Sequence, residues 1–560
     1  MTEPVLQVEN ISISFSADGN TTNAVKDISF LVEPAQTVAI VGESGSGKSV
    51  TALSIMQLLP KQSTLSGNIL FAGKNLAQLS PKEINTIRGK DIGMIFQEPM
   101  TSLNPVFTCG YQVMEAIQLH QQLSAKEAKK KTIELFEKVK LPDPAAIIDR
   151  YPHQLSGGQK QRVMIAMAIS CNPSLLIADE PTTALDVTVQ KTILDLIKEL
   201  QQQNGMSVII ITHDLGLVAD VADKIIVMHK GQIVEQANAK NILTDPQHPY
   251  TKALLACRPG LHPKGERLPL ISDFLETDPS SLKQQKEHAA INTTSNEIVL
   301  KVEHVKVYYP GKRTLFGKTP EPFKAVDDVS FTVSKGEIVG LVGESGCGKT
   351  TLGRAILHLQ QVTSGSILLQ EKNLSHLPKT ALRNLRKDVQ IVFQDPYGSL
   401  NPRLTIGEAI LEPMTVHSLL ANNKQRKEKV IELLEKVDLD AGFYDRYPHQ
   451  FSGGQRQRIC IARALALNPS FLVFDESVSA LDVSVQAQVL NLINDLKQEF
   501  QFTGIFISHD LAVVRYISNR ILVMNRGKII EEGDADQVYF SPKMDYTKKL
   551  IDSILGKNIV

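Results

Sequence analysis

Short runs of apolar residues alternate along the chain with longer segments whose apolar positions repeat at helical spacing. Residues 37–41, 175–178 and 208–211 are nearly continuous apolar runs of strand length. Such runs predict strands that are buried on both faces, as in a parallel sheet covered by helices. Between Gln97 and Ser156 the pattern becomes mostly helical. We therefore expect an α/β fold in which a helical subdomain is inserted into a mostly parallel sheet core.

The whole pattern occurs twice. Residues 42–49 (GESGSGKS) return as residues 343–350 (GESGCGKT), and residues 150–159 return as residues 446–455. A period near 300 residues indicates a duplicated domain rather than a solenoid. We predict a first copy over residues 5–255, an extension and linker over 256–296, a second copy over 297–547 and a tail over 548–560. The polar stretch 280–288 has linker composition, and the Gly- and Pro-rich stretch 310–322 predicts a loop insertion.

Composition narrows the classes of function. Lys plus Arg and Asp plus Glu both total 60, so the formal net charge is zero and no nucleic acid is expected as a partner. No apolar run approaches the roughly 18 residues of a membrane span, and the N-terminus has no secretory-signal pattern. The cysteines stand singly, which suggests no disulfide framework or zinc site and fits a reducing cytosol. They are Cys109, Cys171, Cys257, Cys347 and Cys460.

The sequence G-x-x-x-x-G-K-[ST] is intact in both copies, each time between a predicted strand and a predicted helix. Glycines let the backbone N–H groups face phosphates, and the helix N-terminus adds a positive dipole. Lys48 and Lys349 would reach the β- and γ-phosphates, and Ser49 and Thr350 would bind Mg²⁺. The alternative, a glycine-rich turn followed by a chance Lys-Ser, is disfavoured by two copies in matched context. The predicted ATP-binding loops are Gly42, Glu43, Ser44, Gly45, Ser46, Gly47, Lys48 and Ser49, and Gly343, Glu344, Ser345, Gly346, Cys347, Gly348, Lys349 and Thr350.

Two acids end an apolar strand in each copy, Asp179 with Glu180 and Asp475 with Glu476. A buried carboxylate needs a cation or hydrogen-bond donors nearby. We expect the aspartates to help hold Mg²⁺ and the glutamates to polarise the attacking water.

A histidine followed by Asp-Leu comes after another predicted strand in each copy, at His213 and His509. Each could sense the γ-phosphate. An ordinary strand-end histidine that hydrogen-bonds to backbone is the alternative for either residue alone.

Together these motifs resemble the ATP-binding-cassette (ABC) ATPase family over about nine-tenths of the chain. Two tetrads match the family signature; Leu155 precedes the first, and Phe451 before the second is a mild departure. A helix cap is the plain alternative for either tetrad alone, since a small hydroxyl and two glycines also present N–H groups to an anion. The tetrads are Ser156, Gly157, Gly158 and Gln159, and Ser452, Gly453, Gly454 and Gln455.

The resemblance assigns further residues. Gln97 and Gln394 match the glutamine loop, which contacts Mg²⁺ and senses the transport subunits. Phe15 and Tyr309 stand where the family stacks a ring on adenine; an edge-strand core aromatic is the alternative. Residues 184–186 and 480–482 match a loop at the cassette–cassette interface.

The family pairs two cassettes head to tail, so each signature tetrad would complete the ATP site on the other copy's phosphate loop. This pairing would be intramolecular here. Because Glu180 and Glu476 are both present, we expect two hydrolytic sites.

Residues 97–105 and 394–402, each ending in Ser-Leu-Asn-Pro, resemble the oligopeptide/dipeptide importer branch, as does the extension at 245–255, reduced at 541–550. The resemblance implies a peripheral ATPase on the cytoplasmic face of the inner membrane, with two permease subunits and, indirectly, a substrate-binding protein as partners. Fused relatives serve peptide, glutathione and peptide-antibiotic uptake. Some members carry an iron–sulfur centre in the extension, but only Cys257 is near, so we expect none.

A soluble tandem-cassette ATPase that acts on the ribosome is the alternative. That branch usually has a long charged linker, whereas the linker here is short and polar. The transported solute is not encoded in these motifs, because cassettes contact permeases and not the cargo.

Overall fold

The computed structural model describes residues 3–17, 19–183, 185–275, 295, 297–310, 321–374, 377–554 and 556. The predicted linker at 280–288, most of the predicted loop at 310–322, Ala184 of the interface loop and the end of the predicted tail lie outside these residues. Two compact units are present. The first comprises the described residues up to Ala256 together with 271–275, and the second comprises Cys257–Leu270 and the residues from 295 to Ile554.

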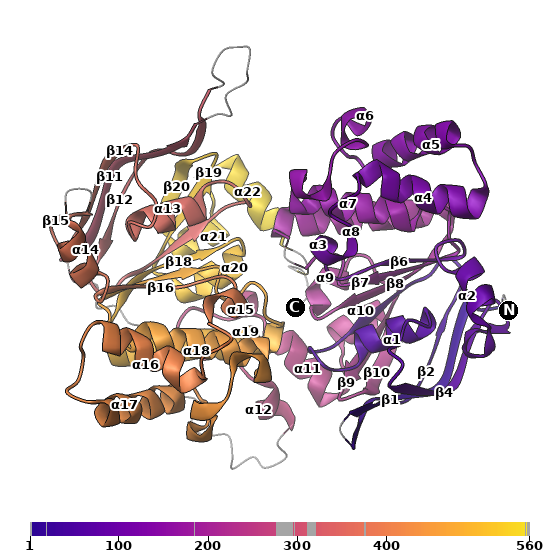
Figure 1. Cartoon of the computed structure of the whole chain (residues 1–560), viewed down its shortest axis with the longest axis horizontal. Coiled ribbons are helices and arrows are strands. Elements are labelled where there is room, and N and C mark those ends of the chain that lie inside the picture. Colours follow the sequence, from indigo (N-terminus) through magenta and orange to yellow (C-terminus); the bar gives the residue numbers. More distant parts are fainter. Residues whose placement is uncertain are drawn as a thin grey trace. The chain divides into compact units, whose positions relative to one another are not determined.

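The first unit is built on a six-stranded sheet in the order β10-β9-β3-β8-β7-β6 (Figure 1). All neighbouring strands are parallel except β9 and β10, which confirms the predicted mostly parallel core. Every residue of β3, β7 and β8 is buried, as expected for strands covered on both faces. The strands are β3 (Thr37–Val41), β6 (Ile92–Ile95), β7 (Leu175–Asp179), β8 (Ser207–Thr212), β9 (Lys224–His229) and β10 (Gln232–Asn238).

A second, antiparallel sheet in the order β2-β1-β4-β5 was not predicted from the sequence. Its strands alternate buried and exposed positions, and a register shift between Val8 and Ile11 breaks this alternation in β1. Such an interrupted period-2 pattern is weaker than a continuous apolar run. The strands are β1 (Leu6–Ala17), β2 (Asn20–Val32), β4 (Ser63–Phe71) and β5 (Lys74–Asn75).

The predicted helical insertion is present in the first unit, and within it α4, α5 and α7 pack on one another. Helix α5 begins with a reciprocal capping box between Ser124 and Glu127. The insertion contains α3 (Pro99–Ser102), α4 (Cys109–Gln121), α5 (Ala125–Lys138), α6 (Pro144–Ile147) and α7 (Gly157–Ala168). The remaining helices are α1 (Lys48–Ile55), α2 (Pro81–Ile87), α8 (Val187–Asn204), α9 (Leu215–Val218), α10 (Ala239–Thr244), α11 (Pro249–Ala256) and α12 (Ile271–Leu275).

The second unit repeats both sheets, in the orders β16-β17-β18-β13-β19-β20 and β12-β11-β14-β15. Its strands are β11 (Ile298–Tyr309), β12 (Phe323–Ser334), β13 (Ile338–Val342), β14 (Ser364–Leu369), β15 (Lys372–Asn373), β16 (Val389–Val392), β17 (Phe471–Asp475), β18 (Thr503–Ser508), β19 (Arg520–Asn525) and β20 (Lys528–Asp534). Its helices are α13 (Lys349–Ile356), α14 (Lys379–Leu385), α15 (Pro396–Ser399), α16 (Ile406–Val416), α17 (Asn423–Lys436), α18 (Gly453–Leu465), α19 (Val483–Phe500), α20 (Leu511–Ile517), α21 (Ala535–Phe540) and α22 (Asp545–Asp552).

The parallel strands determine where the chemistry collects. Strands β3, β7 and β8 are neighbours and run in the same direction, so their carboxyl ends lie at one edge of the sheet. The phosphate loop follows β3, Glu180 follows β7 and His213 follows β8. Three motifs that are far apart in sequence therefore meet at this edge. Among the described residues, none of the helices has the length and apolar character that a membrane crossing requires.

Candidate nucleotide sites

The phosphate loop of the first unit is held in shape by its glycines and its lysine. Gly47 has φ of +99°, and a Cβ there would lie 2.7 Å from the Ala24 carbonyl oxygen, so only glycine fits. The buried Lys48 Nζ donates to the carbonyl oxygens of Gly42 at 2.7 Å and Glu43 at 2.8 Å. These carbonyls satisfy the ammonium group inside the loop. A bound phosphate would offer oxygens of higher charge to the same group.

Beside the loop, the Ser49 hydroxyl donates to Asp179 Oδ1 at 3.0 Å. Burial raises the pKa of Asp179 to about 6, with the Glu180 charge adding to it and the hydrogen bond from Ser49 opposing it. A carboxyl group whose charge is disfavoured in this way gains most from a cation. A hydroxyl and a carboxylate oxygen suit Mg²⁺, which takes few protein ligands and completes its shell with water and phosphate oxygens. The residues present therefore fit the predicted metal.

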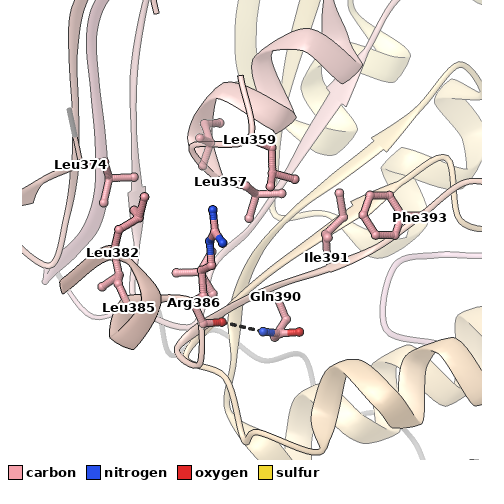
Figure 2. A pocket seen from close by; sticks show the side chains of 11 residues that line it. Leu357, Leu359, Leu374, Leu382, Leu385, Arg386, Gln390, Ile391 and Phe393 are labelled. Carbon is pink, nitrogen blue, oxygen red and sulfur yellow. Dashed lines mark hydrogen bonds between the residues drawn. The ribbon is translucent and has the colours of Figure 1, made fainter. Parts of the chain in front are cut away.

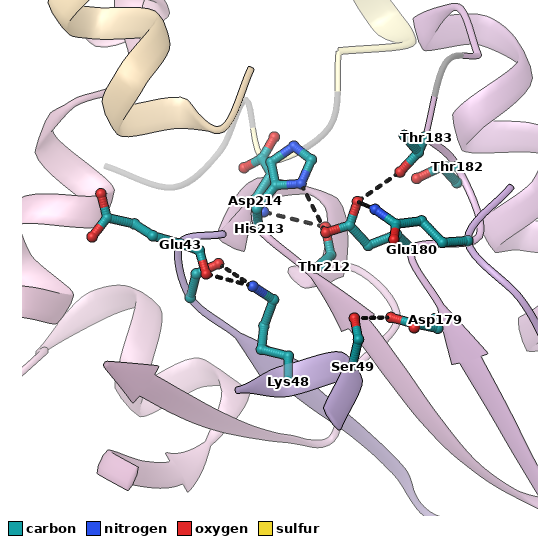
Figure 3. Close-up of polar contacts among 12 residues, drawn as sticks. Glu43, Lys48, Ser49, Asp179, Glu180, Thr182, Thr183, Thr212, His213 and Asp214 are labelled. Atoms are coloured by element: carbon teal, nitrogen blue, oxygen red, sulfur yellow. Dashed lines mark hydrogen bonds and ion pairs between the residues drawn. The ribbon is translucent and has the colours of Figure 1, made fainter. Parts of the chain in front are cut away.

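Glu180 follows β7 and lies among polar side chains of the site (Figure 3). Its φ of +45° lies in the left-handed region, and its N–H donates to the Ile211 carbonyl oxygen at 2.9 Å. A non-glycine residue in this conformation stores strain that the surrounding structure must offset, and such residues concentrate at functional sites. The hydrogen bond to β8 thus fixes the position of the Glu180 main chain at the edge of the sheet.

The Glu180 carboxylate is surrounded by donors. Gln97 Nε2 donates to it at 3.1 Å, Thr183 Oγ1 donates at 2.8 Å, and His213 Nδ1 lies 3.4 Å away. Burial raises the pKa of Glu180, but hydrogen bonds and charge from His213, the Thr183 hydroxyl and the Lys48 charge outweigh it and lower the pKa to about 2. A carboxylate with this pKa stays charged at neutral pH, so it can orient a water molecule but accepts a proton weakly.

The second unit repeats this arrangement. Lys349 Nζ donates to the Gly343 and Glu344 carbonyl oxygens at 2.7 and 3.0 Å, and the Thr350 hydroxyl donates to Asp475 at 3.1 Å. The glutamate and histidine that correspond to Glu180 and His213 are Glu476, with φ of +48°, and His509, whose Nδ1 lies 3.7 Å from Glu476 Oε2. Gln394 Nε2 donates to Glu476 at 2.8 Å, as Gln97 does to Glu180.

The pKa shifts in the second site have the same directions. Burial raises the pKa of Asp475, whereas His509 and Lys349 lower the pKa of Glu476 against the effect of burial. Both copies thus separate the two acids electrostatically into one that awaits a cation and one that stays charged. The structure brings together the predicted lysine, hydroxyl, aspartate, glutamate and histidine in each unit.

Each signature tetrad begins a helix, as its residue types predict. Ser156 accepts a hydrogen bond from Gln159 N and Ser452 accepts one from Gln455 N, in reciprocal capping boxes at the starts of α7 and α18. A Cβ on Gly158 would lie 2.9 Å from Val189, so this glycine permits close helix packing. At Gly157, by contrast, a Cβ would make only an ordinary 3.4 Å contact, and its backbone stays open to a ligand.

A cavity of about 480 Å³ borders the second tetrad, with Ser452, Gln455 and Arg458 in its lining. The helix dipole favours an anion at the tetrad. Asp438, which pairs with Arg458 at 3.7 Å, and Asp440 also line the cavity and add negative charge to it. The helix cap is thus observed, and the anion-binding role of the tetrad stays a prediction.

The ABC transporter family model matches residues 25–183 and again residues 326–479. The chain belongs to the ABC transporter family. A second model, the C-terminal region of oligopeptide/dipeptide transporters, matches residues 234–281. The cassettes are thus ATPases of a transporter, and the comparisons give no support to the ribosomal alternative.

The curated relatives of this ABC protein are also fused tandem-cassette chains. The glutathione import ATP-binding protein GsiA of Pectobacterium atrosepticum is 46% identical over 558 residues, which cover 98% of this chain and 89% of the relative. GsiA of Escherichia coli K12 is 48% identical over 566 residues with the same coverage. A solved dimeric ATP-binding cassette bound to ADP and phosphate aligns with 42% of this chain and 98% of its own at 27% identity, with a TM-score of 0.39.

The two aromatic residues predicted to stack on adenine differ in how far the ABC cassettes bury them. Phe15 is partly buried against the core of the first unit, whereas Tyr309 at the end of β11 is 38% exposed. The adenine-stacking role of both residues stays a prediction. In the interface loops, Asp186 caps α8 and Asp482 caps α19 through their side chains.

The sequence interpretation missed two tyrosines of the cassettes. The hydroxyl of Tyr250 accepts a hydrogen bond from the backbone N–H of Glu43 in the phosphate loop at 3.0 Å, and Tyr546 does the same for Glu344 at 3.1 Å. Tyr250 is fully buried and packs against His229. The C-terminal extension of each cassette thus reaches back to its own phosphate loop. The available signal was the Tyr-Thr-Lys tripeptide that both copies repeat at 250–252 and 546–548.

Proposed function

We propose that this chain hydrolyses ATP at two sites and thereby energises the import of glutathione or short peptides. The observation that supports two sites is the complete set of functional residues in each unit. In particular, Glu180 and Glu476 have the same strained backbone conformation and the same amide and histidine partners.

In this proposal the two cassettes pair head to tail. ATP on Lys48 is completed by Ser452, Gly453, Gly454 and Gln455, and ATP on Lys349 by Ser156, Gly157, Gly158 and Gln159. Two ATP molecules hold the cassettes together by this double attachment. Hydrolysis releases the pair, so differential binding of ATP and products drives closing and reopening.

At each site the protein contributes position and charge. Ser49 and Asp179, and likewise Thr350 and Asp475, would hold Mg²⁺, with Gln97 and Gln394 as the predicted further contacts. The metal supplies charge stabilisation to the transferred phosphoryl group. Glu180 and Glu476 orient the attacking water in line with the γ-phosphorus, since phosphoryl transfer depends mainly on positioning and electrostatics.

Single substitutions test whether both sites hydrolyse ATP. Glu180→Gln and Glu476→Gln each preserve shape but remove the charge that orients water. We expect each variant to lose a large part of the steady-state ATPase rate and the double variant to lose nearly all of it. Complete loss in one variant with full activity in the other would contradict two hydrolytic sites.

The solute assignment is supported by the names of the curated relatives and by the oligopeptide/dipeptide C-terminal region. Uptake of labelled glutathione by cells lacking this gene, complemented with the normal chain or with the double variant, tests it. Uptake restored only by the normal chain is the expected result. If both complemented strains take up glutathione equally, this chain does not energise that transport, and labelled di- and tripeptides should be measured in the same cells.

We further propose that permease subunits dock beside the glutamine loop. An apolar pocket of about 180 Å³ in the second unit is lined by Leu357, Leu382, Leu385 and Phe393, and Phe393 directly precedes Gln394 (Figure 2). An apolar segment of a permease that enters this pocket would press on the residue that contacts Glu476. The pocket therefore supports a path from the permease to the hydrolytic glutamate.

Leu382→Asp tests this docking. It should abolish uptake while the purified chain keeps its ATPase activity, because the pocket lies outside the nucleotide site. The matched control is Ile298→Asp, which replaces a half-exposed apolar side chain of the same size as leucine on β11 and should leave uptake intact. Equal uptake by both variants would exclude the pocket as the docking site.

A pull-down tests the predicted partners and location. The ATP-trapped double variant is recovered from detergent-solubilised cells through an affinity tag. Two multi-span membrane proteins are the expected companions, which would support a peripheral position on the cytoplasmic face of the inner membrane. Recovery of ribosomal subunits without membrane proteins would contradict the importer.

A further inference from the structure

The segment between the two cassettes contains a stretch that is folded onto the second unit. Residues 257–270 follow α11 of the first cassette in sequence, yet they belong to the compact unit of the second cassette. Cys257, Pro259 and Leu268 of this segment are buried. The segment was predicted to be part of an extension and linker, for which burial is not expected. We call residues 257–270 the strap.

The strap is held through its backbone by buried side chains of α19 and α20. Asn491 accepts a hydrogen bond from Leu268 N at 3.0 Å and donates one to Leu268 O at 2.8 Å. Tyr516 donates its hydroxyl proton to the Glu266 carbonyl oxygen at 2.7 Å. Asn491 and Tyr516 are 1% and 2% exposed. The Tyr516 hydroxyl also lies 3.3 Å from Asn491 Oδ1, so the two side chains and the strap form one buried polar network.

Charged residues extend the contact at its two ends. Arg267 pairs with Asp495 at 3.1 Å, and Arg515 donates to the Gly260 carbonyl oxygen at 3.4 Å. The contact of Arg515 is at the outer end of the hydrogen-bond range, and the pair of Arg267 with Asp495 is partly exposed. These contacts therefore orient the strap more than they stabilise it. The stabilising part is the apolar side chain of Leu268, which is 1% exposed.

Comparison of the two copies shows that the docking residues are particular to the second cassette. The offset of 296 residues that relates the signatures also relates α8 to α19. At this offset Asp195 stands in place of Asn491, Asp220 in place of Tyr516 and Ala219 in place of Arg515. The first cassette therefore lacks the bidentate amide, the phenol and the guanidinium, although the two copies share their nucleotide motifs.

We propose that the strap is a built-in docking peptide that fastens the end of the first cassette to α19 and α20 of the second without nucleotide. Its partner is this chain's own second cassette. Covalent fusion alone would leave the cassettes free to separate by the length of the linker, whereas a docked strap shortens that tether and raises their effective concentration. The inference does not depend on which solute is transported.

The test uses the full chain with a protease site inserted between residues 281 and 290, after the strap. The folded protein is cleaved without nucleotide and with EDTA, and the two fragments are separated by size-exclusion chromatography. We expect the fragments of the otherwise normal chain to elute together. If they separate on cleavage, the strap does not hold the second cassette and the proposal is wrong.

Leu268→Asp is the decisive variant because it changes the strap and leaves both cassettes intact. It should raise the dissociation constant of the cleaved fragments about 100-fold, as expected when a buried leucine is replaced by a charged group. Tyr516→Phe removes the hydroxyl that bonds to the strap at Glu266 and to Asn491 within the second cassette. It should raise the dissociation constant about 5- to 10-fold and keeps the test valid if Leu268→Asp folds poorly.

The first cassette provides the matched controls. Asp195→Ala and Asp220→Ala alter the positions that correspond to Asn491 and Tyr516 and should leave the dissociation constant unchanged. Nucleotide binding by each uncleaved variant verifies that it is folded. Co-elution of the Leu268→Asp and Tyr516→Phe fragments with unchanged affinity would show that other contacts hold the cassettes and would overturn the proposal.

Discussion

Removal of one hydroxyl group in the C-terminal extension should weaken ATP binding at the phosphate loop, which it contacts although the two are far apart in sequence. The change is Tyr250→Phe. Phenylalanine keeps the buried ring and its packing on His229, whose centroid is 4.1 Å away. It removes the hydroxyl group, which accepts from the Glu43 N–H at 3.0 Å and donates to Glu43 Oε2 at 3.3 Å. The variant therefore isolates the polar contact of the extension with Glu43 of the phosphate loop.

The size of the effect follows from burial. Tyr250 is fully buried, and the hydrogen bond is 3.0 Å long. A buried donor that loses its partner costs about 1–2 kcal/mol, because water does not replace the lost acceptor fully. If this free energy is required to bring the phosphate loop back to its binding conformation, the affinity for ATP falls about 5- to 30-fold.

The assay is a titration with a fluorescent ATP analogue in a Lys349→Ala background, where only the first site binds. Tyr111→Phe, at a tyrosine that is 48% exposed, is the control for loss of a phenol and should have no effect. Tyr546→Phe, measured in a Lys48→Ala background, should weaken the second site similarly. A dissociation constant within twofold of normal for Tyr250→Phe would refute the view that the extension positions the loop.

Three further predictions concern charge and stability. The pKa of Asp179 is raised to about 6, and its carboxyl group binds Mg²⁺ only as the anion. The Mg²⁺ affinity of the first site, measured by Mg²⁺ titration, should therefore be intact at pH 7 and fall about tenfold by pH 5. An affinity that does not change with pH would contradict the raised pKa of Asp179. His213→Ala removes a partner of Glu180 and should lower kcat at the first site about 100-fold with ATP binding retained; loss of binding instead would assign His213 a different role. Arg520→Met leaves the buried Glu337 without its 3.0 Å ion pair and should lower the free energy of unfolding of the second cassette, measured with denaturant, by about 2–4 kcal/mol. Lys224→Met, at the corresponding position of the first cassette, should lower it by less than about 1 kcal/mol. Equal losses in the two variants would exclude the ion pair as the cause.

Much of each nucleotide site could be predicted because its residues lie in short contiguous motifs. The phosphate loop, Asp179 and Glu180 each follow a continuous apolar strand, and such strands are easily recognised. Parallel pairing then brings the motifs to one edge of the sheet. The order of motifs along the chain thus contained most of the geometry of the site.

What sequence reasoning missed depends on contacts between distant residues or on backbone conformation. Tyr250 and Glu43 are 207 positions apart, and Asn491 and Leu268 are 223 apart, so no local pattern links them. Glu180 has a positive φ and hydrogen-bonds to the neighbouring strand through its N–H. The identity of the residue in the sequence does not indicate this backbone conformation. The antiparallel sheet was missed because bulges interrupt its alternation.

If each cassette has a complete nucleotide site, one chain binds two ATP molecules at once, and the number of trapped nucleotides measures this. The Glu180→Gln/Glu476→Gln double variant is incubated with labelled ATP and Mg²⁺, freed of unbound nucleotide by rapid gel filtration and analysed for ATP per polypeptide. We expect two ATP molecules to be retained on each chain. Retention of one ATP or none, by a folded protein, would contradict this expectation.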